Sequence, residues 1–346
     1  MNPINILLSA VGRRAYLVEY FKAAVRDGGG KVYVVNCLPD ATGLLAADAF
    51  EIVPPSADSG YVEKMLDLCR RWNVALLFSL HDWDAPVIAR HRERFLEIGT
   101  IPVMGRAELL ATCLDKFATV EAVKKLDVCV PWTTLSLDEA LDWQKRNGRA
   151  LIVKPRWGQG SIGLFKVSTP SELTWAFNLS AVTAARFAAA CPEINAKEPQ
   201  VIVQECIGGV EYGCDIVNDL EGRYRSSFVK RKFGMRAGET DAAESVEHPA
   251  VVAAAEKIGR WSGHLGCMDS DWIVGDDGVP RLIELNPRFG GGYPFTHAAG
   301  ANVVRACVDW ANGIDDYGWC ADFKIGVKAF KEIGIHVCDA DDNPQA

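Results

Sequence analysis

The stretch MDSDWIVGDDGVPRLIELNPRFGGG, residues 268–292, decides the fold. Two apolar, strand-forming runs flank Asp277-Gly278, a dipeptide that favours a two-residue turn between antiparallel strands. Because side chains alternate along a strand, such a turn places Asp271 opposite Glu284, with Asn286 two residues further along the same face. The opposite face is expected to pack into a core through Trp272, Val274, Ile283 and Leu285.

Two carboxylates that face each other destabilise a sheet unless something neutralises them. A divalent cation would do so, and two carboxylates with an amide oxygen suit Mg²⁺, with Mn²⁺ as a substitute. We therefore predict a metal site at Asp271, Glu284 and Asn286, and the alternative is a solvated hairpin face. Arg288 follows two residues later, and its planar guanidinium is suited to stabilising a phosphoryl group during transfer.

A glycine-rich loop follows a strand that ends at Lys154, in VKPRWGQGSIG at residues 153–163. Its glycines let backbone N–H groups approach phosphate oxygens, while the lysine adds a positive charge. A purely structural turn is the alternative. The loop lacks the Walker A pattern, and Gln159 stands where the hydrolase motif G-x-S-x-G needs its first glycine, so both of those classes are disfavoured.

A third motif, QECIGGVEY at residues 204–212, carries an apolar strand into a Gly-Gly turn. An exposed strand end offers backbone donors and acceptors to the edge of an adenine ring. Glu211, just beyond the turn, can accept hydrogen bonds from ribose hydroxyls. The same strand, turn and glutamate also occur in proteins of other functions.

The order of these motifs resembles the ATP-grasp superfamily, especially the branch of the carbamoyl-phosphate synthase large subunit and biotin carboxylase. The resemblance implies that ATP and Mg²⁺ bind between two antiparallel lobes. It assigns the magnesium ligands to Asp271, Glu284 and Asn286, and it places Arg288 beside the γ-phosphate. The positions that match the family's nucleotide contacts are Lys116, Lys154, Gly158, Gly160, Ser161, Gln204, Glu205, Ile207 and Glu211.

The resemblance also implies a reaction. An acid is activated by ATP as an acyl phosphate and passed to an amine or a related nucleophile, with release of ADP and phosphate. The implied partners are small-molecule acid and amine substrates, and the protein is a candidate homo-oligomer. Two rivals stay open: a catalytically silent ATP-binding regulatory protein of the same fold, and an oxidoreductase. Gly12 is a single glycine where a dinucleotide loop needs three, which argues against NAD binding.

The alternation of strands and helices predicts an α/β plus α+β chain. Residues 1–105 alternate strands with helices, which predicts a doubly wound parallel sheet, the pre-ATP-grasp domain of the resembling family. Residues 106–204 are interpreted as linker helices and the small lobe of a two-lobed ATP-grasp fold. Residues 205–337 form its large lobe, and residues 338–346 are predicted to be a disordered tail.

The charged segment at residues 230–245 is interpreted as a loop long enough to be a mobile lid. We expect Lys230 or Lys232 to reach the phosphates of the nucleotide, and Arg236 to reach the acyl phosphate. Lys230 and Arg236 are therefore counted as catalytic candidates together with Arg288. The alternative is a solvated charged loop.

Two groups in the amino-terminal part have open roles. Arg13 and Arg14 begin a predicted helix, and they either face the acid substrate or lie on the surface. His81, Asp82 and Asp84 follow a predicted strand at the carboxyl end, where open α/β sheets bind ligands. They either touch substrate or cap the next helix.

Composition excludes several classes. The 346 residues are 49% hydrophobic and 24% charged, and no apolar run approaches the roughly 20 residues that span a bilayer. The net charge of −8 argues against a broad nucleic-acid surface. The eleven cysteines contain no C-x-x-C pair, so we expect reduced thiols and a cytoplasmic location.

Overall fold

The amino-terminal part of the chain is a parallel sheet with helices on both faces. The computed structural model describes residues 3–191, 194–236 and 238–335, so the predicted tail lies outside the described residues. The five strands lie in the order β3-β2-β1-β4-β5, and neighbouring strands are parallel. Their bounds are β1 Asn5–Ser9, β2 Val32–Asn36, β3 Ala49–Ile52, β4 Val74–Ser79 and β5 Ile101–Pro102.

Alternate side chains of β1 supply two different cores, which is why its sequence is apolar without interruption. Ile6 and Leu8 pack into one cluster and Leu7 into the other, and all three are fully buried. The segment that follows Asp84 forms two helices that meet at His91. The helices of this part are α1 Ala15–Val25, η1 Arg26–Gly28, α2 Thr42–Leu45, α3 Tyr61–Arg71, α4 Ala85–Arg90 and α5 Arg92–Glu97.

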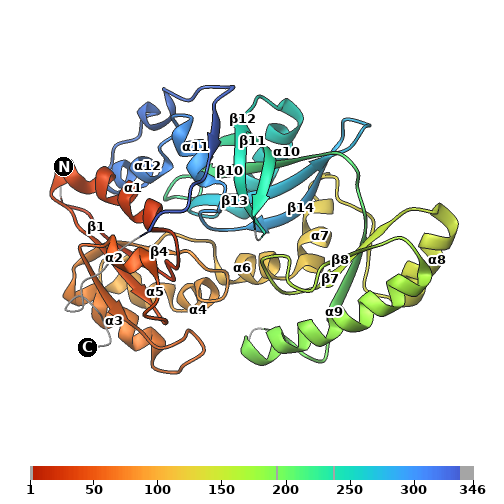
Figure 1. The fold of residues 1–346 in the computed structure, drawn as a ribbon. Helices are drawn as coiled ribbons and strands as arrows, with labels where there is room; N and C mark the ends of the chain where they lie inside the picture. The colour runs from red at the N-terminus through yellow and green to blue at the C-terminus, as the bar shows by residue number, and fades with distance from the viewer. Residues whose placement is uncertain (1–2, 192–193, 237, 336–346) are drawn as a thin grey trace.

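A second, smaller lobe extends to one side of the molecule (Figure 1). Its antiparallel sheet has the order β6-β9-β7-β8, with β6 Thr133–Thr134, β7 Leu151–Pro155, β8 Phe165–Val167 and β9 Val201–Glu205. Asp115 is the one residue between α6 and α7, and its side chain caps α7 by accepting hydrogen bonds from the backbone of Phe117 and Ala118. The helices are α6 Ala107–Leu114, α7 Lys116–Lys124, α8 Leu137–Asn147 and α9 Pro170–Ala190.

The large lobe is a six-stranded sheet of order β14-β13-β10-β11-β12-β15. The strands are β10 Val210–Asn218, β11 Tyr224–Arg236, β12 Glu239–Ser245, β13 Gly266–Val274, β14 Pro280–Asn286 and β15 Lys328–Phe330. The remaining helices are α10 Pro249–Ser262, α11 Tyr293–Ala298, α12 Val303–Ala311 and η2 Gly318–Cys320. The α/β plus α+β class predicted from the sequence is therefore confirmed.

The segment at residues 230–245 corrects one prediction, because it is a hairpin and not a loop. β11 continues to Arg236, and β12 pairs with it in antiparallel register. The register shifts at Gly234, whose lack of a side chain permits the irregular pairing. Its many charged residues suggested a loop, but an interior strand with exposed positions carries charges equally well.

The hairpin of β13 and β14 confirms the predicted pairing of Asp271 with Glu284. The turn differs from the prediction, since Gly278 donates its backbone N–H to the carbonyl of Gly275 and the strands are joined by five residues. A bulge after Asp271 absorbs the difference in register. As a result Leu282, not Ile283, packs into the core with Trp272 and Leu285.

One continuous core joins the amino-terminal sheet to the large lobe. Phe289, which follows Arg288 in the chain, packs its ring against Phe21 at 5.8 Å and against Phe78 at 6.1 Å between centroids. Both partners belong to the amino-terminal part, so the chain that leaves β14 is anchored there. Among the described residues, no helix has the length and apolar character needed to cross a bilayer.

Candidate active site

Two cavities adjoin one another where the three parts of the chain meet. The larger has a volume of about 480 Å³ and lies between β7, the β9–β10 connection and the β13–β14 hairpin. The smaller has a volume of about 20 Å³ and lies between the amino-terminal domain and the end of β14. Lys116, Gly158, Gln159 and Glu284 line both cavities. A ligand in one cavity therefore lies within reach of a ligand in the other.

The larger cavity collects the nine positions that match the nucleotide contacts of the resembling family. It is lined by Lys116, Lys154, Gly158, Gly160, Ser161, Gln204, Glu205, Ile207 and Glu211. Its volume falls in the range typical of small-molecule sites. The sequence did not predict its apolar lining, which includes Ile152, Leu164, Met235, Ile273 and Ile283. Ile152 and Ile273 had a signal, because Ile152 alternates with the core residues Leu151 and Val153, and Ile273 alternates with Trp272 and Val274.

Two lysines place positive charge in the larger cavity. Lys154 ends the buried strand β7 and is 6% exposed. Burial, together with the neighbouring charge of Lys116, lowers the pKa of Lys154 to about 8. The Lys116 ammonium lies 2.6 Å from the Gly158 carbonyl oxygen and 3.0 Å from Glu284 Oε1. An anionic ligand would favour the charged form of Lys154.

Gly158 shows why the loop needs glycine at one position. Its φ of +144° is a conformation that side chains rarely adopt, and a Cβ there would lie 2.7 Å from the Phe187 ring. Ser161 also has a positive φ, of +57°. The loop is therefore closely fitted between β7 and the end of α9.

The two opposed carboxylates are neutralised by lysines. Lys232 Nζ lies 2.6 Å from Asp271 Oδ1 and 2.9 Å from Glu211 Oε1, and Lys116 pairs with Glu284. Burial raises the pKa of Asp271 to about 6 in spite of Lys232. Burial acts in the same direction on Glu284, but the charges of Lys116 and Lys154 outweigh it and lower the pKa of that carboxyl.

Two carboxylates and one amide remain the candidate metal ligands. The described part of the chain holds no group of three or more His, Cys, Asp or Glu side chains that could bind a metal by themselves. Asp271 and Glu284 nevertheless present opposed hard oxygens to the cavity, and Asn286 lines the adjoining one. This donor set fits Mg²⁺ that takes its other ligands from phosphates and water.

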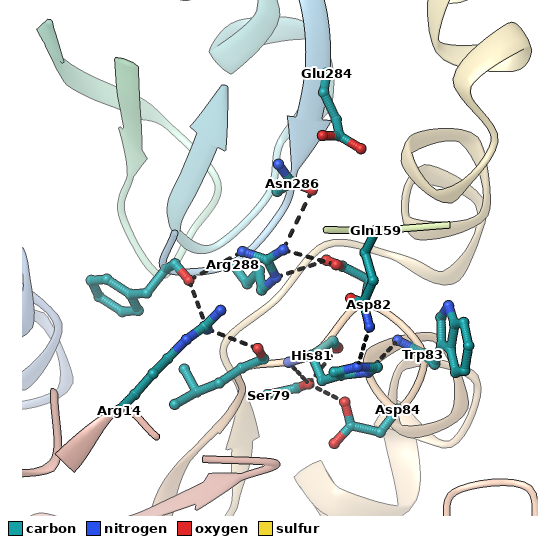
Figure 2. A network of polar contacts seen from close by, with 12 residues as sticks. Arg14, Ser79, His81, Asp82, Trp83, Asp84, Gln159, Glu284, Asn286 and Arg288 are labelled. Carbon is teal, nitrogen blue, oxygen red and sulfur yellow. Dashed lines mark hydrogen bonds and ion pairs between the residues drawn. The ribbon is translucent and has the colours of Figure 1, made fainter. Parts of the chain in front are cut away.

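Arg288 is held by the amino-terminal domain (Figure 2). Its Nε and Nη2 atoms lie 2.8 Å from Asp82 Oδ1 and Oδ2. Burial opposes both charges, yet the ion pair outweighs it, so the pKa of Arg288 is raised and that of Asp82 is lowered. Behind them, Arg14 Nη1 donates to the carbonyls of Leu80, at 2.8 Å, and Phe289, at 3.2 Å. Asp82 thus fixes the arginine at the mouth of the smaller cavity.

The structure does not support the predicted positions of Lys230 and Arg236. Lys230 is 1% exposed, and its ammonium lies 2.6 Å from Asp215 Oδ2 and 3.2 Å from Thr296 Oγ1, beneath the site. Arg236 pairs at 2.7 Å with Asp241 near the end of the β11–β12 hairpin. Neither lines the described walls of the two cavities. Of the basic residues on β11, Lys232 is the one that reaches Asp271.

Glycines after Arg288 cover Lys230 and its neighbour Asp269, and no local sequence signal indicates this packing. A Cβ on Gly292 would lie 2.7 Å from Lys230 Cε, and a Cβ on Gly290 would lie 2.2 Å from the Asp269 carboxyl carbon. The loop after Arg288 can therefore pack directly onto the buried charges of the sheet. This close approach helps to fix where Arg288 leaves the strand.

Arg13, Asp84 and His81, whose roles the sequence analysis left open, lie in different environments. Arg13 is exposed, whereas Asp84 is buried and accepts hydrogen bonds from Ser9, at 2.5 Å, and from Tyr61, at 3.2 Å. Asp84 makes no side-chain cap for α4. His81 lines the smaller cavity beside Asp82.

Two family models match this chain. Residues 6–103 match the PylC-like, N-terminal domain, and residues 197–329 match the ATP-grasp described as being in the biosynthetic pathway with Ter operon. A curated relative, D-alanine–D-alanine ligase of Nitratidesulfovibrio vulgaris strain DP4, is 26% identical over 188 residues. The match covers 50% of this chain and 56% of that relative, so the chain spans little more than half of its length.

Solved structures share the fold at low sequence identity. The biotin carboxylase domain of Hydrogenobacter thermophilus 2-oxoglutarate carboxylase, solved with MgADP, ADP and bicarbonate, has a TM-score of 0.74 at 15% identity and covers 95% of this chain and 74% of that one. The L-amino acid ligase of Bacillus licheniformis has a TM-score of 0.69 at 17% identity and covers 90% and 75%.

The fold and the matched domains define the class. The chain has the ATP-grasp fold: its amino-terminal sheet matches the PylC-like N-terminal domain, and an ATP-grasp family model matches residues 197–329.

Proposed function

We propose that this protein is an ADP-forming carboxylate ligase, which binds Mg-ATP in the larger cavity and an acid in the smaller one. The observation that carries the proposal is the shared wall of the two cavities. There Lys116 and Glu284 face both spaces, and Arg288 stands beside them. A γ-phosphate bound at this wall would lie next to the acid.

The residues of the larger cavity are suited to each part of a nucleotide. The apolar side chains Ile152, Ile273 and Ile283 offer faces for a purine ring, and Glu211 offers acceptors to the ribose. The phosphates of the nucleotide would replace Glu284 as the ion-pair partner of Lys116. That exchange frees Glu284 to bind Mg²⁺ together with Asp271 and Asn286, and the cation supplies charge compensation at the phosphate oxygens.

The proposed chemistry has two steps. An oxygen of the acid attacks the γ-phosphorus, the bond from that phosphorus to the β–γ bridging oxygen breaks, and ADP leaves with the electron pair. The nitrogen of an amine then attacks the acyl carbon, phosphate leaves with the former acid oxygen, and the amine loses a proton to water. Lys154 and Arg288 hold positive charge where negative charge develops, and Asp82 keeps the guanidinium in place.

The comparisons support ligation without fixing the substrates. D-alanine–D-alanine ligase and L-amino acid ligase are, by their names, ligases of amino acids. We accordingly propose small-molecule acid and amine substrates for this chain, and we propose the division into residues 1–105, 106–204 and 205–337. Homo-oligomerisation is a further proposal that size measurements in solution would test.

Acid-dependent ADP release tests the proposal. Purified protein is given Mg-ATP, a pool of carboxylic acids and hydroxylamine, which converts acyl phosphates to hydroxamates. The proposal predicts ADP and hydroxamate in equal amounts, and neither without the divalent cation. Tight Mg-ATP binding with no ADP release from any acid would instead identify a regulatory nucleotide-binding protein.

A further inference from the structure

The smaller cavity is closed by contacts between domains that are far apart in the sequence. His81 Nε2 lies 2.9 Å from the Gln159 side-chain amide, which belongs to the glycine-rich loop (Figure 2). The backbone N–H of Trp83 donates to His81 Nδ1 at 3.2 Å and so fixes the orientation of the ring. The segment after β4 therefore holds the loop of the small lobe.

Trp83 strengthens the same closure. Its ring meets Phe187 of α9 edge-on at 5.9 Å between centroids, within a cluster that also contains Leu114. On the far side of the loop, a Cβ on Gly238 would lie 3.0 Å from Gly160, so the end of the β11–β12 hairpin rests against it. The loop is thus held from both sides over the cavities.

The smaller cavity has one polar wall and one largely apolar wall. One wall is polar and carries Asn286 and Arg288, and the other is largely apolar and consists of Trp83, Ala85, Leu110, Cys113 and Leu114. The cavity volume of about 20 Å³ has room for about one water molecule. Its described charged side chains are two cations, Lys116 and Arg288, and two anions, Asp82 and Glu284. Since the proposed function assigns Lys116 to the phosphates, Arg288 is the one described cation of this cavity left for a carboxylate, and none remains for a second.

We propose that Trp83, together with the contact between His81 and Gln159, sets the upper size of the acid and selects short monocarboxylates. The inference rests on the proposed function. A carboxylate bound at the Arg288 wall must extend its tail toward the indole of Trp83. A longer or branched tail would meet that ring, since the bound nucleotide would fill the larger cavity on the other side of the shared wall.

Trp83→Ala tests the size limit. Formate, acetate, propionate, butyrate and hexanoate are compared by kcat/KM for hydroxamate formation with saturating Mg-ATP. The wild type should prefer the shortest acids, and the variant should raise the ratio of hexanoate to acetate by at least about tenfold, as expected when a pocket gains space for several methylenes. Gln159→Ala removes only the side-chain contact with His81, so it should shift the ratio of hexanoate to acetate in the same direction by a smaller factor.

Trp72→Ala is the matched control. Trp72 is also a half-buried tryptophan of the amino-terminal domain, stacked on Tyr33 at 4.6 Å, and it lies outside the described cavity lining. It should lose stability without any change in the acid ratio. Trp83→Leu serves if Trp83→Ala fails to fold, with a smaller shift in the same direction.

Direct binding separates the two proposals. Calorimetry with Mg²⁺ and a non-hydrolysable ATP analogue measures the affinity for each acid without turnover. A longer-acid preference in Trp83→Ala supports the size limit even if no acid yields hydroxamate, a result that would overturn only the ligase assignment. An unchanged preference in both assays, or no binding of any acid to the wild type, overturns the role of Trp83.

Discussion

The ion pair between Asp82 and Arg288 is the contact whose loss the structure predicts most sharply. Its side chains are 15% and 12% exposed, and it joins the amino-terminal domain to the end of β14. Removal of one partner of a buried pair costs about 3–5 kcal/mol. Asparagine keeps one acceptor oxygen, so we expect Asp82→Asn to lower the free energy of unfolding by about 2–3 kcal/mol.

A double-mutant cycle isolates this contact. Urea unfolding is measured for wild type, Asp82→Asn, Arg288→Gln and the double variant, and the double variant should be more stable than the sum of the single losses predicts, because neither charge is then left unpaired. Asp277→Asn is the control, since Asp277 makes a similar forked contact with Arg281 on the surface, at 2.7 and 3.0 Å. The control should change stability little.

The stabilisation from the Asp82–Arg288 ion pair should also depend on pH. The folded-state pKa of Asp82 is lowered, so the stabilisation is present above the unfolded pKa and is lost as the pH falls through the folded value. The stability difference between wild type and Asp82→Asn should therefore persist at neutral pH and shrink only in acid. An Asp82→Asn loss no greater than that of Asp277→Asn, or strictly additive effects in the cycle, would refute the reasoning.

Three further predictions follow from the site and the loop beside it. Lys154 has a pKa of about 8, so the affinity for ATP should weaken above pH 8 in the wild type, and Lys154→Arg, which stays charged, should lose that dependence in calorimetric titrations. Glu284→Gln should abolish Mg²⁺-dependent ADP release. Without metal, its free energy of unfolding should be unchanged or lower by up to about 1 kcal/mol, because the carboxylate is paired with Lys116 at 3.0 Å. A clear rise in its melting temperature would contradict this prediction. Gly290→Ala should lower the free energy of unfolding by about 1–3 kcal/mol, because its Cβ would overlap the Asp269 carboxylate. Gly208→Ala is the control: a Cβ there meets nothing within 4 Å, so its melting temperature should stay close to that of the wild type.

Features set by local pattern were predictable from the sequence. The five parallel strands follow from apolar runs that alternate with helices, and the pairing of Asp271 with Glu284 follows from strand spacing around a turn signal. The turn itself was not predicted, because a bulge after Asp271 compensates for the longer connection. That compensation is why a wrong turn type still gave the right pair of carboxylates.

Features set by distant contacts could not be predicted. Asp82 and Arg288 are 206 residues apart, and nothing in either segment indicates the other. Lys230 and Lys232 lie two residues apart on β11, yet Lys230 packs beneath Gly292 and pairs with Asp215, whereas Lys232 reaches Asp271 at the cavity. A lysine beneath a glycine loop has the same local sequence pattern as one that pairs with a carboxylate of the cavity.

Transfer of an acid oxygen to phosphate tests the central claim most directly. An acid that supports turnover is labelled with ¹⁸O in its carboxylate and incubated with Mg-ATP and hydroxylamine, and the released phosphate is analysed by mass spectrometry. Attack of the carboxylate on the γ-phosphorus predicts that each phosphate carries one oxygen from the acid and that ADP carries none. Phosphate without label, released at the same rate with and without the acid, would show simple ATP hydrolysis and would contradict a ligase that works through an acyl phosphate.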